Sequence, residues 1–408
     1  IEFNIQRRLF CNINMSVPCS EVMNETKEKP STRKRSVEHS ENPEISNSAK
    51  KHLPSESEVD NEETKQSSNT EECTDNAILV AKHYNSLIDG ELTLRNKSRI
   101  LYMRNFNNWV KSELISEYIN KIKHKAHGYP INVLDMCCGK GGDLFKWRNA
   151  NITHLICADL AEITVQQCRD RYQDITKKSD KDLFTVEFIT ADCTKVRIRE
   201  KFKDPSILLD IVSCQFAFHY CFESLPQAEC MLKNASECLK PGGYFIGTIP
   251  DAYDLVSRWQ QCDSNSFGNE IYNIEFRCDK TDPPIFGAKY NFQLEGVVNC
   301  PEFLVYMPVF RKLALKFDLE LILFERFETF FERMKDRSTK MLQRIQGLET
   351  YPPRQEESLT GKPDQDYQHA KEYMENSSNR REIGTLSQPE WEVTSLYAVF
   401  VFQKRKTL

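Results

Sequence analysis

Apolar and polar positions alternate along this chain in two different periods, from about residue 100 to its end. Short apolar runs bounded by polar residues predict strands, whereas apolar residues three or four positions apart predict helices. The expected strands are Asn132–Met136, His154–Ala158, Thr185–Ala191, Leu208–Cys214, Tyr244–Ile249, Leu319–Phe324 and Leu396–Phe402. The expected helices are Tyr102–Ile122, one that begins at Asp143, Glu162 to about Tyr172, Pro226–Leu239, Pro301–Phe317 and Phe327 to about Ile345.

Strands that are apolar on both faces and separated by helices predict a parallel sheet with helices on both faces. The expected fold class is therefore α/β and Rossmann-like, with a seven-stranded, mostly parallel sheet. Its last two strands, 319–324 and 396–402, are expected to pair and to run opposite to the parallel strands. Residues 250 to about 300 interrupt the alternation and predict an inserted lobe. Residues 351–381 are polar and contain proline, and they predict a flexible loop.

The N-terminal part of the chain has a different composition. No Phe, Tyr or Trp occurs from Cys11 to His83, where Glu, Ser, Asn, Thr and Lys prevail. Such a segment cannot bury enough apolar surface to offset the entropy of ordering the chain. Residues 1–76 are therefore expected to be a disordered arm, and residues 77–408 a folded domain. Residues 1–14 precede the first methionine, Met15, and are expected to be either translated leader or a fragment artefact.

Charge and cysteine content narrow the choice of function. The 408 residues carry a formal net charge of −5, which argues against indiscriminate binding to polyanions and leaves local basic patches for any contact with nucleic acid. In the arm, Arg33–Arg35 and Lys50–His52 fit either nuclear-import signals or ordinary solvated charges. No run approaches eighteen apolar residues, so no membrane span is expected. The fifteen cysteines include no Cys-x-x-Cys pair, which favours small buried thiols in a reducing compartment over disulfides or zinc ligands.

The most informative motif is the run from Val133 to Asp143, in which a buried strand breaks into a glycine-rich turn and then enters a helix. Glycines at 139, 141 and 142 let the backbone take positive φ and let a ligand approach closely. Asp135 would repel a pyrophosphate but suits a cationic ligand that carries hydroxyl groups. S-adenosylmethionine has a sulfonium, an ammonium and a ribose, so the pattern Asp-x-Cys-x-Gly-x-Gly-Gly predicts this cofactor rather than a nicotinamide dinucleotide.

Acidic residues stand at the ends of the first three expected strands. Asp135, Asp159 and Asp192 stand where ligands of open α/β sheets bind, beyond the carboxyl ends of the strands. Asp159 is expected to accept hydrogen bonds from the ribose hydroxyls, and Asp192 from the adenine amino group. Gln215, just past the fourth strand, is expected to reach the ligand from the other side.

Several segments together resemble the eukaryotic messenger-RNA cap guanine-N7 methyltransferases. The likeness runs in matching order from about Ala81 to Phe402, and it is carried by Asn105–Lys111, residues 135–143, Ser213–Tyr220, Pro241–Gly243, Phe267–Glu270 and Leu294–Val298. It implies a class I methyltransferase in the nucleus that moves methyl from S-adenosylmethionine to N7 of the guanosine cap of pre-mRNA. It also implies capped pre-mRNA, the capping and transcription machinery and a small activating subunit as partners. The family usually has glycine where this chain has Cys137, so this position is expected to hold a backbone angle that tolerates a Cβ.

The resemblance assigns roles to residues at matching positions. It implies that Lys111 pairs with the cofactor carboxylate and that the cofactor is bound by Lys111, Asp135, Cys137, Gly139, Asp159, Asp192, Gln215 and Tyr220. It implies that the cap is bound by Asn107, Asn108, Lys140, Lys146, Arg171, His219, Glu295 and Tyr397. Glu295 can accept from guanine N1–H and N2–H₂ together. The cationic side chains of Lys140, Lys146 and Arg171 suit a triphosphate bridge. No metal and no general base are expected, since guanine N7 carries a lone pair at neutral pH.

Two other classes of function stay open from the sequence. One is a methyltransferase that acts on another substrate, which depends on whether Glu295 discriminates guanine. The other is a non-catalytic RNA-binding or scaffold protein that keeps the fold, although the intact acidic strand ends favour an enzyme. A nicotinamide oxidoreductase is least expected, because Asp135 and the Cys137 turn poorly suit a pyrophosphate.

Overall fold

A computed structural model describes residues 76–86, 98–125, 128–179, 183–355, 357–377 and 381–406 of the chain, and every structural statement below concerns these ranges. The predicted disordered arm lies outside them except for Asn76, as do both basic clusters of the arm. Within the described ranges, none of the helices combines the length and the apolar character that a membrane crossing requires.

The central sheet is built from seven strands in the order β10-β13-β5-β4-β1-β2-β3. Their bounds are β1 Asn132–Met136, β2 His154–Asp159, β3 Thr185–Thr190, β4 Leu209–Gln215, β5 Leu239–Pro250, β10 Leu319–Arg326 and β13 Tyr397–Lys404. Strands β1 to β5 pair in parallel, which confirms the predicted fold class. The Pro241–Gly243 segment, predicted to separate a helix from β5, lies inside β5 instead.

The prediction that the last two strands both run opposite to the others was wrong for one of them. Strand β13 is antiparallel to both of its neighbours, β5 and β10, so β10 runs in the same direction as β5. Helix α9, Met307–Lys316, precedes β10 and acts as the crossover connection that a parallel strand needs. Only β13 is reversed.

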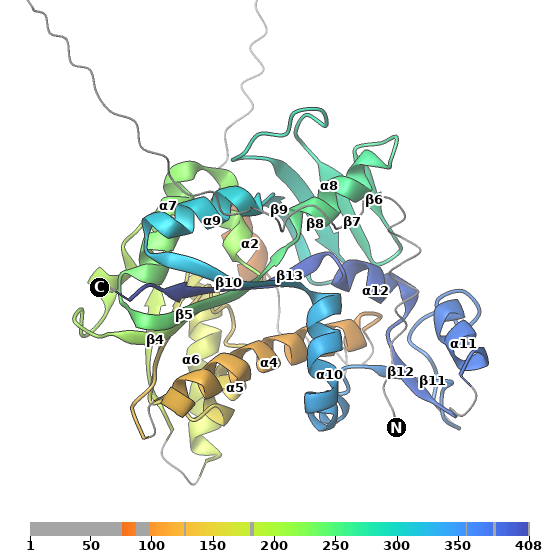
Figure 1. Ribbon diagram of the computed structural model, residues 1–408, viewed down its shortest axis with the longest axis horizontal. Coiled ribbons are helices and arrows are strands. Elements are labelled where there is room, and N and C mark those ends of the chain that lie inside the picture. Colours follow the sequence, from red (N-terminus) through yellow and green to blue (C-terminus); the bar gives the residue numbers. More distant parts are fainter. Residues whose placement is uncertain are drawn as a thin grey trace, which may run out of the picture. The chain divides into compact units, whose positions relative to one another are not determined.

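Helices cover both faces of this sheet. In Figure 1, α4 (Leu101–Lys125), α5 (Leu144–Asn149), α6 (Glu162–Lys177) and α10 (Phe327–Arg344) lie on one face, and α7 (Leu225–Ser236) and α9 on the other. On the second face, Phe218 stacks on Phe310 with ring centroids 4.4 Å apart, and Phe400 packs against both rings. These rings have no exposed surface, so this aromatic cluster contributes to fixing the helices on the sheet.

Residues 250 to about 300, predicted as an inserted lobe, hold helix α8 and most of a second sheet. The lobe consists of α8 Ala252–Gln260, β6 Ser266–Gly268, β7 Tyr272–Phe276, β8 Lys289–Leu294 and β9 Val298–Phe303, and its four strands pair in antiparallel order. The predicted helix Pro301–Phe317 therefore begins too early. Pro301 pairs with Asn291 in the lobe sheet, and the helix starts only at Met307 with proline in its first turn.

The polar segment 351–381 is more ordered than the predicted loop. It contains α11 Gln368–Glu375, and β11 Glu349–Tyr351 pairs with β12 Ile383–Thr385 across it. Tyr367 is fully buried there, and its hydroxyl group donates to Glu349. The sequence pattern missed these elements because each is short and its few apolar residues pack within a small core of their own.

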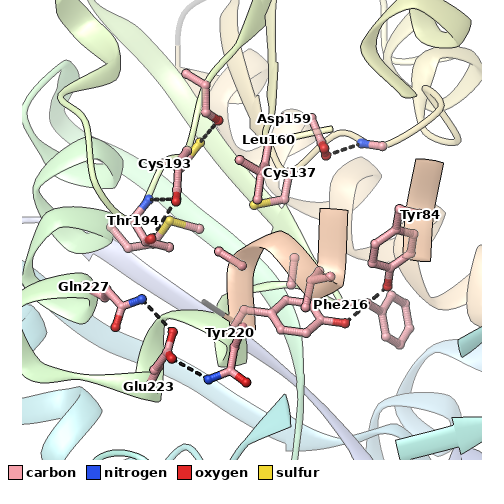
Figure 2. Close-up of a pocket in the computed structure, with 18 of the residues that line it drawn as sticks. Tyr84, Cys137, Asp159, Leu160, Cys193, Thr194, Phe216, Tyr220, Glu223 and Gln227 are labelled. Carbon is pink, nitrogen blue, oxygen red and sulfur yellow. Dashed lines mark hydrogen bonds between the residues drawn. The ribbon is translucent and has the colours of Figure 1, made fainter. Parts of the chain in front are cut away.

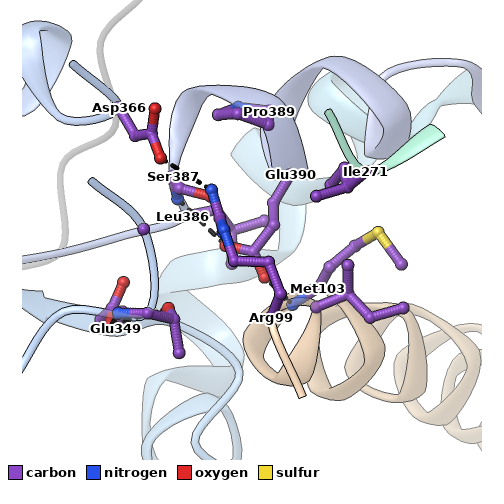
Figure 3. Close-up of polar contacts among 12 residues, drawn as sticks. Arg99, Met103, Ile271, Glu349, Asp366, Leu386, Ser387, Pro389 and Glu390 are labelled. Atoms are coloured by element: carbon purple, nitrogen blue, oxygen red, sulfur yellow. Dashed lines mark hydrogen bonds and ion pairs between the residues drawn. The ribbon is translucent and has the colours of Figure 1, made fainter. Parts of the chain in front are cut away.

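Arg99 joins this C-terminal segment to the main domain (Figure 3). Its guanidinium lies 2.8 Å from an oxygen of Asp366 and donates to the Ser387 hydroxyl at 3.0 Å. Ser387 precedes helix α12, Gln388–Thr394, and caps it together with Glu390. The buried Glu390 carboxylate also accepts from the Met103 amide of α4 at 3.0 Å. The Arg99 guanidinium, just before α4, thus links the start of α12 to the segment before α11.

We expect the stability of the fold to fall between about pH 4.5 and pH 7 because of Glu390. Burial raises the pKa of this carboxyl from 4.5 to about 7. The folded chain therefore holds a proton there more tightly than the unfolded chain, and the resulting stabilisation is complete below pH 4.5 and lost as the pH rises through 7. Glu390→Gln should reduce the loss of unfolding free energy between pH 5 and pH 8 by on the order of 1–3 kcal/mol.

Urea unfolding at both pH values measures this effect, with Glu375→Gln on the exposed face of α11 as the control. An unchanged pH dependence in Glu390→Gln would assign the titration to another group.

Candidate active site

The glycine-rich loop between β1 and α5 bends through three residues with positive φ. Gly139 has φ 51° and Gly141 has φ 72°, as the motif predicted, whereas the prediction was wrong for Gly142, which does not have positive φ. A Cβ at Gly141 would lie 2.7 Å from the sulfur of Cys168, whereas a Cβ at Gly139 would meet nothing within 4 Å. Packing thus requires glycine at position 141, whereas Gly139 leaves open space where a ligand can approach.

Cys137 is the third residue of this loop with positive φ, at 58°. The expectation that its backbone angle tolerates a Cβ was therefore wrong, because this region favours glycine. The loop keeps the conformation that glycine would adopt, and the cysteine is held there with a cost in backbone energy. Its thiol lies among those of Cys193 and Cys214. The hydrogen bond with Cys193 lowers the pKa of Cys137, but the hydrogen bond with Cys214 and burial together raise it.

Cys137→Gly is expected to stabilise the chain by about 0.5–1 kcal/mol, since glycine removes the strained Cβ while the lost thiol contacts offset part of the gain. Affinity for the ligand of this loop should stay the same or increase. Urea unfolding and ligand titration measure the two quantities. A clear loss of affinity would mean that the thiol itself contributes to binding.

Asp159, at the end of β2, fixes the loop from the side. One carboxylate oxygen accepts from the Gly139 amide at 2.8 Å, and the other accepts from the Ala161 amide at 2.9 Å and from the Thr164 hydroxyl at 3.3 Å. Burial raises the pKa of Asp159, although these hydrogen bonds oppose the rise. Figure 2 shows the carboxylate at the edge of the pocket, beside Cys137 and Leu160.

A cavity of about 220 Å³ opens beyond the carboxyl ends of β1 to β4. Six of the eight residues predicted to bind the cofactor line it, namely Cys137, Gly139, Asp159, Asp192, Gln215 and Tyr220. Asp192 accepts from the Thr194 amide at 2.9 Å, which orients its carboxylate. The side-chain oxygen of Gln215 is buried and has no hydrogen-bond partner among the residues described. The wall of the cavity therefore presents acceptors that are ready for a ligand.

Helix α2, Asn76–Ser86, closes the cavity on one side (Figure 2) and was not predicted from the sequence. Asn76, Ala77, Val80 and Tyr84 line the cavity, and the Tyr84 hydroxyl is 3.2 Å from that of Tyr220. The apolar run from Ala77 to Ala81 was the available signal. It is short and follows the polar arm, so it was not recognised as a helix.

The same helix also reaches the inserted lobe. Asn76 donates to Glu223 at 2.6 Å and accepts from Lys289 of β8 at 2.9 Å. The ring of His83 is 3.2 Å from the carbonyl oxygen of Val297, in the turn between β8 and β9. Helix α2 thus contacts both the cavity and the turn that carries Glu295.

Lys111 and Asp135 do not line the cavity, and both lie near Asp143 at the start of α5. Lys111 and Lys146 both lie within 2.8 Å of one oxygen of Asp143, which precedes α5. Burial alone would raise the pKa of Asp143, but Lys111 and Lys146 outweigh this effect and lower it. Burial raises the pKa of Asp135 well above its usual range, while the Trp147 indole donates to it at 3.1 Å. Asp143, which organises this cluster, was not among the predicted site residues.

His219 and Tyr397 lie at the opposite end of the site, around a buried glutamate. The His219 ring is 3.3 Å from Glu302, which also accepts from the Tyr290 hydroxyl at 2.8 Å. Tyr397 is buried and packs edge-on against Phe216 at 5.0 Å. The Tyr397 pKa is raised by burial and by the nearby Glu302. Glu302 was not predicted, because nothing in the sequence distinguishes it from a surface glutamate of β9.

The other residues predicted to bind the cap have different surroundings. Glu295 is exposed in the turn after β8, so its carboxylate does not depend on a buried donor. Asn108 accepts from Lys146 at 3.1 Å, and the side-chain oxygen of Asn107 is buried without a partner in the described ranges. Lys140 lies in the loop and Arg171 on α6, and both are partly buried.

The chain matches the family model described as "mRNA (guanine-N(7))-methyltransferase domain" over residues 66–405. It is 50% identical over 339 residues to the mRNA cap guanine-N(7) methyltransferase of Drosophila melanogaster, covering 81% of this chain and 78% of that protein. The protein of the same name from Caenorhabditis elegans is 40% identical, with 80% and 87% covered. The mRNA cap guanine-N(7) methyltransferase 1 of Oryza sativa subsp. japonica is 36% identical, with 81% and 82% covered.

The chain belongs to the mRNA guanine-N7 methyltransferase family. Its cofactor is S-adenosylmethionine, the methyl donor of this family, and it transfers that methyl group to N7 of the cap guanosine. The cavity fits the cofactor, since the unpartnered oxygen of Gln215 and the open space at Gly139 offer an acceptor and a close approach to the backbone. When bound, the cofactor supplies an activated methyl group on its sulfonium.

Two truncated chains distinguish the contribution of the arm from that of helix α2. A chain that begins at Asp75 should fold and bind cofactor like the full chain, whereas one that begins at Ser98 should fold but bind S-adenosylmethionine about tenfold more weakly. The second truncation removes four residues that line the cavity and the Tyr84–Tyr220 hydrogen bond. No residue of α2 is buried, so overall stability should change little.

Isothermal titration and thermal unfolding measure the two effects. Equal cofactor affinity in both truncated chains would show that α2 does not contribute to the site.

Proposed function

We propose that the cap guanine is bound between the Tyr220 end of the cavity and the turn after β8, while S-adenosylmethionine occupies the strand ends. The observation that carries this proposal is the position of helix α2. Tyr84 of α2 contacts Tyr220 at the cavity, and His83, its neighbour in sequence, contacts Val297 in the turn. S-adenosylmethionine in the cavity and a guanine beside the turn would therefore both lie against helix α2.

Glu295 is proposed to recognise the guanine. A carboxylate has two acceptor oxygens, which match the N1–H and N2–H₂ donors of guanine and which adenine cannot satisfy. Glu295 is exposed, with its backbone amide donating to Ile271 at 3.0 Å. The backbone is thus fixed while the carboxylate stays available for a base.

His219 and Tyr397 are proposed to contact the base and its ribose from the side of the sheet. Glu302 lies 3.3 Å from the His219 ring and so orients it. Glu302 is proposed as a positioning residue, since both it and His219 are buried.

The triphosphate bridge is proposed to lie near Lys140, Lys146 and Arg171. Lys111 and Lys146 share one carboxylate, that of Asp143. Two cations against one anion leave a positive charge, which attracts an anionic group. Lys111 is proposed to hold the cofactor carboxylate and Lys146 a phosphate, with Asn107 and Asn108 beside them on α4.

Methyl transfer to N7 removes no proton from the base before attack, because the N7 lone pair lies in the ring plane. The residues of the site therefore act by holding N7 and the methyl group in line, to which proximity and orientation contribute roughly 7–11 kcal/mol. Acidic side chains such as Asp159 and Asp192 bind the cofactor without acting as bases. No residue is assigned the role of general acid or base.

Incubation with labelled S-adenosylmethionine and either capped or uncapped RNA, followed by nucleoside analysis, tests the proposed substrate. Label should be found in 7-methylguanosine and only with capped RNA. Label in an internal nucleoside would favour a different substrate, and cofactor binding without any transfer would favour a scaffold protein.

We also propose that the protein acts in the nucleus, together with a small activating subunit and the transcription and capping machinery. The basic clusters Arg33–Arg35 and Lys50–His52 support the nuclear location, although they lie outside the described residues. A fluorescent fusion in which both clusters are replaced by alanine should become cytoplasmic. A fusion that stays nuclear would contradict their role in import.

A further inference from the structure

Three cysteine side chains converge behind the cofactor loop. Cys138 belongs to the loop, Cys157 to β2 and Cys168 to α6, and their sulfur atoms all lie within 4.8 Å of one another. Cys157 and Cys168 have no exposed surface, whereas Cys138 is partly exposed. None of the three is needed for the proposed binding of cofactor or cap.

The spacing of these sulfur atoms suits coordination of one ion. Three sulfurs at about 2.3 Å from a central ion would be about 4 Å apart, which lies within the observed limit of 4.8 Å. Thiolates prefer soft ions such as Cu(I) and Zn²⁺ over hard ions such as Mg²⁺. The group offers three buried sulfur ligands from the described ranges. A soft ion therefore fits this site and a hard ion does not.

We propose that Cys138, Cys157 and Cys168 form a binding site for one soft, thiophilic metal ion, held by three thiolates behind the cofactor loop. Binding displaces the thiol protons to solvent, so that the sulfurs become ligands. The site is coupled to the cofactor cavity through the backbone. The Cys138 amide donates to Ala158 at 3.1 Å, and the next amide, that of Gly139, donates to Asp159. A metal ion that draws Cys138 toward the other two sulfurs would shift this loop and lower cofactor affinity.

The full-length protein, kept reduced with a non-thiol reductant, is titrated with Cd²⁺ as the probe. Ultraviolet absorption of the cadmium–thiolate bond measures the bound ion, and X-ray absorption counts its sulfur ligands. We expect one tightly bound ion with three sulfur ligands. The Kd of S-adenosylmethionine should rise about fivefold or more when Cd²⁺ is bound.

The variants Cys157→Ser and Cys168→Ser should lose this tight ion, and Cys214→Ser should keep it. Cys214 is a matched control, because it is a buried thiol on the neighbouring part of the same sheet but lies outside the cluster. Retention of the ion in Cys168→Ser, or its loss in Cys214→Ser, would overturn the proposal. Fewer than three sulfur ligands in the unmodified protein would also overturn it, whether or not the variants fold. An unchanged cofactor Kd would refute the coupling.

Discussion

Replacing Asp159 with alanine is expected to weaken S-adenosylmethionine binding by about 10- to 150-fold, or roughly 1.5–3 kcal/mol. Two effects combine in this loss. The carboxylate lines the cavity, where it is proposed to hold the ribose, and it also accepts from the Gly139 amide at 2.8 Å. Alanine would remove an acceptor for the ligand and release the loop that the ligand contacts.

Calorimetric titration with S-adenosylmethionine measures the change, and Asp170→Ala on the exposed face of α6 is the matched control. Asp159→Asn separates the two effects, because it keeps the shape of the side chain and removes its charge. Cap affinity should change little in either variant. Cofactor affinity equal to that of the control would move the ribose site elsewhere in the cavity.

The strand ends were predictable because burial and sheet geometry act over short stretches of sequence. Asp135, Asp159 and Asp192 follow apolar runs whose boundaries the structure matches to within one or two residues. Parallel strands bring such ends to one edge of a sheet. Asp159 and Asp192 therefore line one cavity, while Asp135 turns away toward Trp147.

The remainder of the site depends on contacts between distant segments, which local patterns do not report. Tyr84 meets Tyr220 across 136 positions of the chain, and the Glu302–His219 contact joins the lobe to the short 3₁₀ helix Phe218–Glu223 after β4. Cys137 shows a different limit, since its φ of 58° is imposed by the loop against the preference of the residue. Such a conformation follows from tertiary structure that over-determines the backbone.

The position of Glu295 leads to the second large expected effect. Glu295→Gln keeps the shape of the side chain but replaces one acceptor oxygen with a donor amide and removes the charge. One hydrogen bond to the guanine then becomes a repulsive contact or is lost, which costs roughly 2–4 kcal/mol when the unpaired partner is counted. We expect kcat/KM for cap methylation to fall about 30-fold to several hundred-fold.

Steady-state methylation of a guanosine-capped dinucleotide, beside a cofactor titration on the same preparation, measures this effect. Glu275→Gln on β7 is the matched control, because it changes a half-buried glutamate in the same four-stranded lobe. Glu295 does not line the cavity and is exposed, so S-adenosylmethionine affinity should stay unchanged in both variants. Methylation by Glu295→Gln at the rate of the control would exclude Glu295 from guanine recognition. An equal loss of cofactor affinity would instead show that Glu295 supports the lobe against helix α2, through the turn that His83 contacts.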